Sequence, residues 1–379
     1  MLEPVKARAA AHPDGVVDLS IGTPVDPVPS IIRDALASAS NAPGYPLTAG
    51  SPALRAAMTE WVRRSCFAVD GVGGSSVGSG SGVADGSGVA GGFGVAGGSG
   101  VADGSGVAGG FGVLPTLGSK ELVAWLPTLL GLGAGDVVAI PSVCYPTYEV
   151  GARLAGATVV RSLPAANVRL VWINSPGNPN GEVLSDGELR SHVEWARSVG
   201  AVLVSDECYL SLGWEKTPTS VLSVCDGDFT NVLAVHSLSK RSNLAGYRAG
   251  MISGDPALIA ELLAVRKHAG MIMPAPVQAA MIAALGDEVH VAEQRSRYAA
   301  RRSVLRAALV GAGFVIEGSE AGLYLWARHA GDCWETVSWL AERGILAAPG
   351  DFYGPAGRPY VRFALTATDE RIAAACSRL

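Results

Sequence analysis

Apolar residues in the middle of the chain fall into short runs separated by amphipathic stretches. Six runs are Val-rich and apolar almost throughout, at 136–142, 157–163, 168–174, 201–207, 231–237 and 248–254. Such runs predict strands that are covered on both faces. Helical patterns lie between them, at 119–133, 146–156 and 185–200. The alternation predicts the fold class α/β, with a mainly parallel sheet.

The last of these helical patterns carries signals for both of its ends. Ser185 is followed three positions later by Glu188, which is the spacing of a capping box. Gly200 closes the pattern, and glycine is the residue that most often ends a helix. A helix that begins just after Ser185 and ends just before Gly200 is therefore predicted.

After about residue 290 the pattern changes. A long charged helix is predicted at 288–313, and four short strands follow it, at 314–318, 322–327, 345–350 and 360–365. This order predicts a smaller α+β domain. We therefore expect a large domain formed by 41–285, and a small domain formed by 1–40 together with 286–379.

One segment inside the large domain, 71–112, consists almost entirely of Gly, Ser, Ala and Val. It repeats with a period of 18, so that Val83 recurs as Val101 and Phe93 as Phe111. A phosphate-binding loop would need one short glycine cluster between a strand and a helix, and neither neighbour is predicted here. The segment is interpreted as a low-complexity surface insertion whose deletion should leave activity intact.

Composition limits the class of protein. Of the 379 residues, 49% are hydrophobic, which excludes a disordered protein for most of the chain. The net charge is −5 and there is no block of Lys and Arg, so neither nucleic acid nor an anionic membrane is an expected partner. The N-terminus has no apolar run of signal-peptide length, and no window of 18 apolar residues predicts a membrane span. A cytoplasmic protein is expected.

The six cysteines are scattered, with no C-x-x-C pair. Disulfide frameworks and metal sites need closer grouping. Reduced thiols and no bound metal are therefore expected.

Polar residues follow four of the predicted strands at the ends where ligands bind in open α/β sheets. These residues are Tyr145, Asn178, Asp206, Tyr209, Ser237 and Lys240. Each has an ordinary explanation when it is taken alone. Asp206 could cap a helix, Asn178 could belong to a turn, and Lys240 could be a solvated cation. Together they predict one crevice that holds an acid, an amide, phenols and a lysine.

The stretch 237-SLSK-240, followed by Gly246 and Arg248, resembles the lysine segment of fold-type I pyridoxal-phosphate enzymes, specifically the class I/II aminotransferases. The resemblance covers nearly the whole chain apart from the insertion. It implies that Lys240 forms a Schiff base with the aldehyde of pyridoxal 5'-phosphate and later shuttles protons between Cα and C4′. A free lysine, with a pKa of about 10.4, is mostly protonated, so the site has to lower its pKa.

The same resemblance implies which residues hold the phosphate of the cofactor. Two groups are expected, the side chains of Ser237, Ser239 and Arg248, and the helix start formed by Gly118, Ser119 and Lys120. A guanidinium group binds oxyanions through two donors. The backbone N–H groups and the dipole at a helix N-terminus also favour an anion.

The ring of the cofactor is expected to contact four further residues. By the resemblance, Asp206 keeps the pyridine nitrogen protonated, Tyr209 and Asn178 bind the phenolic oxygen, and Tyr145 stacks on the ring face. Tyr45 resembles the tyrosine that reaches the phosphate in the neighbouring subunit. A homodimer is therefore expected.

Arg362 matches the arginine that binds the α-carboxylate of the substrate in this family, although a surface arginine at a strand end is the plainer reading. Asn178 is expected to contact the substrate as well. The loop 20–24 resembles the segment that closes over the substrate, with Gly22 offering backbone contact. Transamination is the leading reaction, and lyases and decarboxylases of the same fold remain as minor alternatives.

Several segments, including 117–133 and 264–280, look similar to actinobacterial N-succinyldiaminopimelate aminotransferases of lysine biosynthesis. That family uses glutamate as amino donor. Lys120, Arg266 and Lys267 are candidates for the distal part of the substrate by charge alone, and a structural role is the favoured interpretation of each. Two alternatives stay open. The chain could be an aminotransferase of the aspartate or alanine type, or a non-catalytic binding protein that uses its Gly-rich array.

Overall fold

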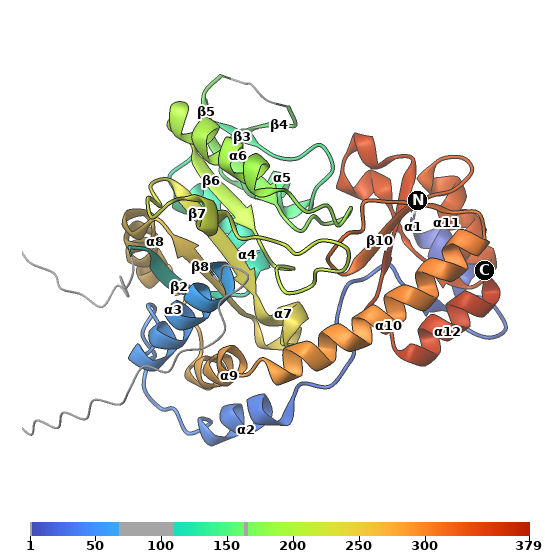
Figure 1. Cartoon of the computed structure of the whole chain (residues 1–379), viewed down its shortest axis with the longest axis horizontal. Helices are drawn as coiled ribbons and strands as arrows, with labels where there is room; N and C mark the ends of the chain where they lie inside the picture. Colours follow the sequence, from blue (N-terminus) through green and yellow to red (C-terminus); the bar gives the residue numbers. More distant parts are fainter. Residues whose placement is uncertain (1, 68–109, 163–165) are drawn as a thin grey trace, which may run out of the picture.

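The computed structural model describes residues 2–67, 110–162 and 166–379. Most of the predicted insertion, 71–112, therefore lies outside the described residues. Its last residues do not: Phe111 is buried in the core, and Gly112 begins a strand. Figure 1 shows a larger part built around one sheet and a smaller part beside it, with helix α10 (Val289–Gly311) running from one to the other.

The larger part contains a seven-stranded sheet with the strand order β2-β8-β7-β6-β5-β3-β4. Its strands are β2 (Gly112–Leu117), β3 (Val137–Ala139), β4 (Thr158–Val160), β5 (Val168–Asn174), β6 (Val202–Asp206), β7 (Val232–Ser237) and β8 (Ala249–Gly254). Strand β8 pairs antiparallel with both of its neighbours, and the other pairs are parallel. This confirms the predicted fold class.

Helices cover both faces of this sheet. We call the face that packs on α4 (Ser119–Leu129), α5 (Thr147–Leu154) and α8 (Pro256–His268) the front face. The rear face packs on α3 (Pro52–Cys66), α6 (Asp186–Ser198) and α9 (Ala275–Gly286). Because side chains alternate along a strand, Leu233 and Val235 of β7 lie in the front core, and Val232 and Ala234 lie in the rear core.

The smaller part has its own core around a four-stranded antiparallel sheet with the order β12-β13-β10-β9. Its strands are β9 (Val315–Glu317), β10 (Tyr324–Arg328), β12 (Ala348–Pro349) and β13 (Tyr360–Ala364). A parallel pair, β1 (Val17–Asp18) and β11 (Ile345–Leu346), brings the N-terminal residues to it. Its helices are α1 (Leu2–Ala10), α11 (Cys333–Glu342) and α12 (Asp369–Arg378).

Short elements complete the chain. These are α2 (Ser30–Ser38), α7 (Leu238–Arg241), and the 3-10 turns η1 (Val221–Val224), η2 (Ala245–Tyr247), η3 (Gly350–Tyr353) and η4 (Pro355–Gly357). Ile32 of α2 lies in the same core as α3 and α9, so this helix packs on the larger part although it falls within 1–40. The predicted division into 41–285 and 1–40 with 286–379 stays a prediction.

Local signals agree with the elements that form. Ser185 and Glu188 make the predicted capping box, since Glu188 N donates to Ser185 Oγ at 3.3 Å and Ser185 N donates to Glu188 Oε2 at 2.8 Å. Strand β2 was not predicted, because its sequence, GVLPTL, adjoins the Gly-rich repeats and contains a proline. Among the described residues, no helix is long and apolar enough to cross a membrane.

Candidate active site

A cavity of about 680 Å³ lies at the carboxyl ends of β5, β6 and β7, against the smaller part. Twelve of the predicted site residues line it: Gly22, Ser119, Lys120, Tyr145, Asn178, Asp206, Tyr209, Ser237, Ser239, Lys240, Arg248 and Arg362. The convergence that was predicted from the strand ends is therefore present. Two predicted residues, Gly118 and Tyr45, do not line this cavity.

Lys240 lies in the short helix α7, which follows β7 directly. Its ammonium group donates a hydrogen bond to the carbonyl of Gly22, in the N-terminal loop. Burial lowers the pKa of Lys240, and the cationic Arg362 and Arg248 act in the same direction, against Tyr324. A lysine with a lowered pKa is a better nucleophile near neutral pH.

Asp206 ends β6 and is buried on the front face. Its Oδ2 accepts a hydrogen bond from the Tyr148 hydroxyl at 2.7 Å, and its Oδ1 accepts one from Cys208 N at 3.2 Å. Burial raises the pKa of Asp206, and in the described part of the chain no Lys or Arg pairs with it. A buried carboxylate with neutral partners is suited to hold a protonated ring nitrogen.

Tyr148 was not predicted as a site residue. It lies three positions after Tyr145 and stacks on Trp172, with ring centroids 4.7 Å apart. Burial, followed by the negative charge of Asp206, raises the pKa of the Tyr148 hydroxyl well above its ordinary value. The hydroxyl therefore stays a hydrogen-bond donor to Asp206. The Y-P-T-Y spacing, which puts both rings near one helix turn, was the available signal.

Two helix starts and one arginine form a cup beside Lys240. Ser237 Oγ accepts a hydrogen bond from Ser239 N at 3.2 Å, where α7 begins. Gly118 precedes α4 with a φ of 78°, and a Cβ atom there would overlap the guanidinium group of Arg248. Gly118 therefore shapes the cup by letting Arg248 approach, although its own surface does not line the cavity.

Arg362 is buried where β13 faces the cavity. It donates to Asn178 Oδ1 at 2.9 Å and to the carbonyl of Ser20 at 2.7 Å. Its guanidinium carbon lies 3.8 Å from the ring centroid of Tyr324 and 4.9 Å from that of Tyr353. A planar cation held between rings is fixed in orientation, as bidentate carboxylate binding requires. The plainer reading of Arg362, a solvated surface residue, is wrong.

Tyr324 is a second site residue that sequence reasoning missed. Its hydroxyl lies 3.2 Å from that of Tyr209, and a Cβ atom on Gly22 would overlap it. Burial acts to raise the pKa of Tyr324, but the charges of Arg362 and Lys240 outweigh it and lower that pKa. In contrast, burial and the neighbouring Tyr324 raise the pKa of Tyr209 well above its ordinary value. The pairing of β10 with β13, which places Tyr324 beside Arg362, was not readable from the sequence.

The three charged candidates for the distal part of a substrate differ in burial and in their position relative to the cavity. Arg266 is fully buried and donates to both carboxylate oxygens of Glu121, at 3.0 and 3.1 Å. Lys267 is exposed on α8 and does not line the cavity. The charge-based suggestion is therefore wrong for Arg266 and unsupported for Lys267. Lys120 does line the cavity.

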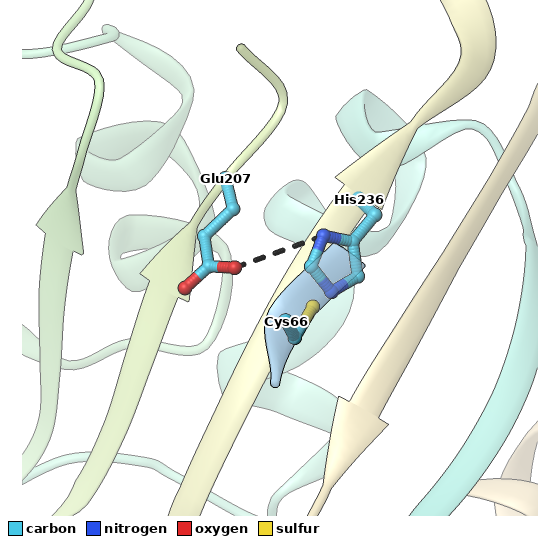
Figure 2. A group of neighbouring side chains, drawn as sticks. All are labelled: Cys66, Glu207 and His236. Atoms are coloured by element: carbon cyan, nitrogen blue, oxygen red, sulfur yellow. Dashed lines mark ion pairs between the residues drawn. The ribbon is translucent and has the colours of Figure 1, made fainter. Parts of the chain in front are cut away.

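A group of three possible metal ligands lies on the rear face, in the part of the chain that the structure describes. Figure 2 shows Cys66 of α3 beside Glu207, which follows β6, and His236, which belongs to β7. Glu207 Oε2 and His236 Nδ1 are 3.8 Å apart, and neither atom has a hydrogen-bond partner. Burial raises the pKa of Glu207 to about 7 and lowers that of His236 to about 3. Both shifts are in the direction of the uncharged form, and none of the three residues lines the catalytic cavity.

Comparisons with known proteins agree with this geometry. The family model for aminotransferase class I and II matches residues 111–379. The chain is 54% identical over 385 residues to a probable aminotransferase of Mycobacterium tuberculosis, covering 100% of this chain and 83% of the relative. It is 55% identical over 386 residues to the 4-dedimethylamino-4-oxo-anhydrotetracycline transaminase OxyQ of Streptomyces rimosus, covering 100% and 97%.

Solved structures of aminotransferases also superpose on this chain. An aminotransferase from Neisseria meningitidis superposes with a TM-score of 0.80 at 29% identity, covering 98% of this chain and 95% of that one. A probable N-succinyldiaminopimelate aminotransferase from Thermus thermophilus superposes with a TM-score of 0.79 at 26% identity, covering 100% and 99%. The fold and the cavity are those of a pyridoxal-phosphate-dependent aminotransferase. The chain belongs to the class I and II aminotransferase family.

The residues of the cavity fit the cofactor that this family uses. A buried carboxylate without a cationic partner stands at Asp206, and a cup of hydroxyl groups and one arginine stands beside Lys240. These two features match the ring nitrogen and the phosphate of pyridoxal 5'-phosphate. The cavity volume of about 680 Å³ also lies within the range of small-molecule sites.

Proposed function

We propose that the enzyme moves an amino group between an amino acid and a 2-oxo acid with Lys240 as its catalytic residue. One observation supports this above all. Lys240 and Arg362 both donate to the loop 20–22, to the carbonyls of Gly22 and Ser20. A nucleophilic amine and a guanidinium group thus meet the same loop in one cavity, where they could bind the amino group and the carboxylate of one amino acid.

The remaining roles are proposed from the resemblance to the family and from the place of each residue in the cavity. The bound cofactor supplies an electron sink that eases loss of the Cα proton. Asp206 would hold a proton at the ring nitrogen, Tyr209 and Asn178 would donate to the ring oxygen, and Tyr145 would pack on the ring. Ser237, Ser239, Arg248 and the start of α4 at Gly118–Lys120 bind the phosphate. Lys240 would carry the proton that is lost from Cα of the substrate. Arg362 holds the carboxylate, and Gly22 closes over it.

The reaction class can be tested directly. Purified protein should be yellow, and borohydride should fix the cofactor to the peptide that contains Lys240. A protein whose absorbance does not change when pyridoxal phosphate is added would contradict the proposal.

For the substrate we propose the N-succinyl derivative of a 2-amino-6-oxo-pimelate, with glutamate as donor, in lysine and diaminopimelate biosynthesis. The named likeness to the Thermus thermophilus structure supports it, as do LL-diaminopimelate aminotransferases, such as that of Aquifex aeolicus at 30% identity over 390 residues. Lys120 is the charged residue of the cavity that is free to meet a distal carboxylate, since it makes no hydrogen bond through its side chain in the described part of the chain.

A second candidate substrate has a specific observation in its favour. OxyQ, at 55% identity over the whole chain, is named for a 4-oxo-anhydrotetracycline. Five aromatic side chains line the cavity here, which suits a flat cyclic ketone as well: Tyr145, Tyr209, Tyr324, Phe352 and Tyr353. An aspartate- or alanine-type substrate remains the simpler alternative.

One substrate panel separates these possibilities. Glutamate-dependent turnover should be compared for the succinylated oxo acid, its unsuccinylated form, oxaloacetate, pyruvate and an anhydrotetracycline 4-ketone. The proposal expects kcat/KM for the succinylated acid to exceed that for each of the others at least about tenfold. Preference for the cyclic ketone would replace it with the second candidate, and preference for oxaloacetate or pyruvate with the simpler one.

We also propose a homodimer in which Tyr45 reaches the phosphate in the partner's site. Tyr45 is 99% exposed here, which a tyrosine with no partner surface rarely is. The stretch 21–47 exposes five large apolar side chains, Ile21, Val25, Ile31, Tyr45 and Leu47. Such a patch is typical of an interface between subunits.

Mixing two variants tests the shared site. Lys240→Ala and Tyr45→Ala subunits, refolded together, should form mixed dimers with one intact site and regain activity that neither variant has alone at limiting cofactor. Absence of recovery in confirmed mixed dimers would contradict the role of Tyr45. A monomer by sedimentation would contradict the dimer itself. A cytoplasmic location stays a prediction, supported by the free state of the six cysteines.

A further inference from the structure

Three consecutive polar residues follow Lys240, and all three are buried. Arg241 and Asn243 are nearly inaccessible, and Ser242 is 0% exposed. Buried polar groups need hydrogen-bond partners, because an unpaired group loses its hydration without compensation. We call residues 240–243 the lysine turn. The partners of its three buried residues therefore determine how firmly it is held.

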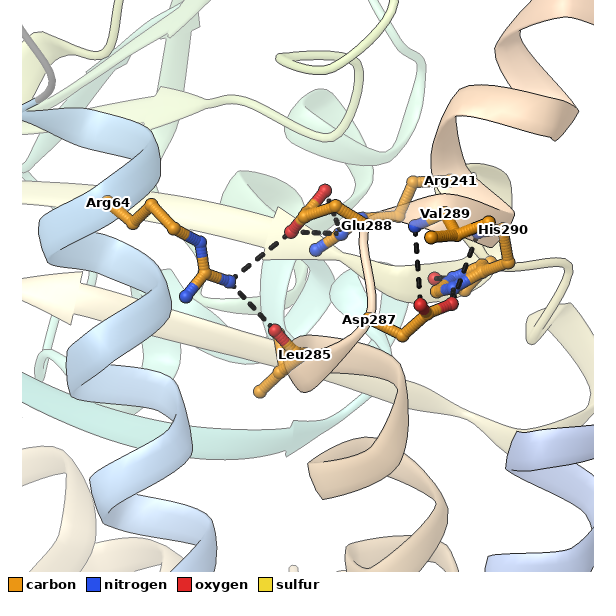
Figure 3. Close-up of polar contacts among 8 residues, drawn as sticks. Arg64, Arg241, Leu285, Asp287, Glu288, Val289 and His290 are labelled. Carbon is orange, nitrogen blue, oxygen red and sulfur yellow. Dashed lines mark hydrogen bonds and ion pairs between the residues drawn. The ribbon is translucent and has the colours of Figure 1, made fainter. Parts of the chain in front are cut away.

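Most of their side-chain partners lie at the start of α10 or just before it, and Asn243 Nδ2 also donates to the carbonyl of Pro27 at 3.3 Å. Arg241 donates to both carboxylate oxygens of Glu288, at 3.0 Å each. Ser242 Oγ lies 2.8 Å from His290 Nε2, and Asn243 Nδ2 donates to Gln294 Oε1 at 2.9 Å. Figure 3 shows Arg241 beside Glu288, and Asp287 beside His290, at the junction between α9 and α10. Each of the three residues thus has at least one side-chain contact with α10 or with the residue that precedes it.

His290, which contacts Ser242, also contacts an acidic residue. His290 Nδ1 lies 2.6 Å from Asp287 Oδ2, so Ser242, His290 and Asp287 form a continuous relay. A hydrolytic triad has the same order of contacts. Here the serine is fully buried and does not line the catalytic cavity, so no substrate can reach it. The relay can therefore act only by holding Ser242, after Lys240, against His290 and Asp287 at the junction between α9 and α10.

The same helix also fixes the loop that lies over Lys240. Gln294 Nε2 donates to Asp26 Oδ2 at 2.7 Å, and Arg301 donates to both oxygens of Asp26 at 2.7 Å. Asp26 lies four residues after Gly22, whose carbonyl accepts the Lys240 hydrogen bond. Helix α10 therefore holds both the turn that carries the lysine and the loop that the lysine meets.

We propose that the Ser242–His290–Asp287 relay is a positioning element for Lys240, which fixes the lysine turn on α10 so that its amine is held inside the catalytic cavity. The three are positioning residues and touch neither substrate nor cofactor. The inference rests on the role of Lys240 proposed above. Misplacement of a reacting group by about 1 Å can lower a rate about 100-fold, so a loosened turn should be visible in catalysis.

The first test uses the cofactor-free protein. An amine-reactive reagent is added across a pH series, and modification of the peptide that contains Lys240 is followed by mass spectrometry. Ser242→Ala and His290→Ala should let the lysine relax toward water, so that its reactivity profile moves up by at least about half a pH unit toward the free value of about 10.4. His290→Gln, which can keep one hydrogen bond, should fall between them and the wild type.

Ser253→Ala is the matched control. Ser253 is also fully buried and also contacts a buried histidine, with its Oγ 3.2 Å from His236 Nε2, but it does not touch residues 241–243. Its labelling profile should equal that of the wild type. In the holoenzyme, Ser242→Ala should lower kcat about tenfold with KM within about threefold, because substrate binding does not use the relay.

The outcomes divide cleanly. If Ser242→Ala and His290→Ala keep the wild-type labelling profile, while their thermal stability falls as in Ser253→Ala, the relay is structural only and the proposal is overturned. If His290→Ala does not fold, Ser242→Ala and His290→Gln decide in the same way. The labelling result does not require that Lys240 be catalytic. An active Lys240→Ala variant would therefore overturn the proposed function and leave this test standing.

Discussion

The front and rear faces of the seven-stranded sheet differ most at the ends of β6 and β7. On the front face, Asp206 and Ser237 line the catalytic cavity beside Lys240. One residue away along the same chain, Glu207 and His236 point to the rear, into a core closed by α3. Both sides carry an acid with a polar neighbour. The pair on the front face is open to a ligand, and the pair on the rear face is enclosed by the core.

Access determines what each acid can do. Asp206 accepts hydrogen bonds from Tyr148 and a backbone amide, and its cavity leaves room for a ligand of opposite charge. Glu207 is closed in, and burial raises its pKa to about 7. An ionisable residue at a strand end is therefore a candidate for function only when its face of the sheet is open.

The largest effect is expected at Lys240. Lys240→Ala removes the amine that we propose as nucleophile and proton carrier, so turnover should fall at least about 1,000-fold and the cofactor should be held weakly. Steady-state assays and absorbance of the bound cofactor measure both. Residual activity above a few per cent would contradict the role of Lys240.

The two neighbouring acids allow a matched comparison. Asp206→Asn keeps the size of the side chain and removes the charge that should hold a protonated ring nitrogen, so kcat should fall about 100-fold or more. Glu207→Gln makes the same change on the rear face, and kcat should stay within about threefold. Equal losses in both variants would show that the two faces are not functionally distinct.

Glu207→Gln should instead change how stability depends on pH. The pKa of Glu207 in the folded protein, about 7, lies above the ordinary value of 4.5, so the folded state favours the protonated acid. The stability that this gives is complete below pH 4.5 and is lost as pH rises through about 7. Between pH 5 and pH 8, the wild type should lose roughly 3 kcal/mol more unfolding free energy than the variant.

Denaturant unfolding across that pH range measures this difference. His236 acts in the opposite sense, because burial lowers its pKa to about 3 and its contribution is lost as pH falls below the ordinary value of 6.5. The same residue is present in both proteins, so its effect cancels in the comparison. Parallel pH curves for the two proteins would contradict the closed state of Glu207.

A smaller effect on the front face is expected at Tyr148. Tyr148→Phe removes the hydrogen bond of 2.7 Å to Asp206 and keeps the ring that stacks on Trp172. Asp206 would then be less firmly oriented, and kcat should fall about tenfold with cofactor affinity reduced. A variant with wild-type kcat and affinity would show that Cys208 N alone orients the carboxylate.

The sequence predicts the strands and the lysine segment well and predicts long-range contacts poorly, for physical reasons. Buried parallel strands such as 168–174 carry a strong local pattern, and the lysine segment at 237–240 is specific enough to indicate the cofactor. Tyr324 and Tyr148 were missed because their roles depend on which strands pair and on which helix face packs inward. The relay from Ser242 to His290 joins residues 48 positions apart, and no local pattern records such a contact.

The smallest effect is expected where the rear core meets the Gly-rich segment. Phe67 and Phe111 flank residues 68–109, which the structure does not describe. Their ring centroids are 5.6 Å apart. Both also pack against Phe229, at 6.0 and 5.8 Å. The chain thus leaves the rear core and re-enters it at neighbouring points, so a short linker can join them.

Replacing residues 70–108 by a short Gly/Ser linker should leave kcat within about twofold and change unfolding free energy by less than about 2 kcal/mol, because the cost of closing a loop depends only weakly on its length. Deleting the full predicted insertion, 71–112, is the informative contrast. It also removes Phe111, which is 1% exposed, and the first residue of β2. Loss of a buried phenylalanine costs about 3–5 kcal/mol, so this deletion should be far less stable. Equal stability of the two deletions, by thermal unfolding, would show that Phe111 does not anchor the rear core.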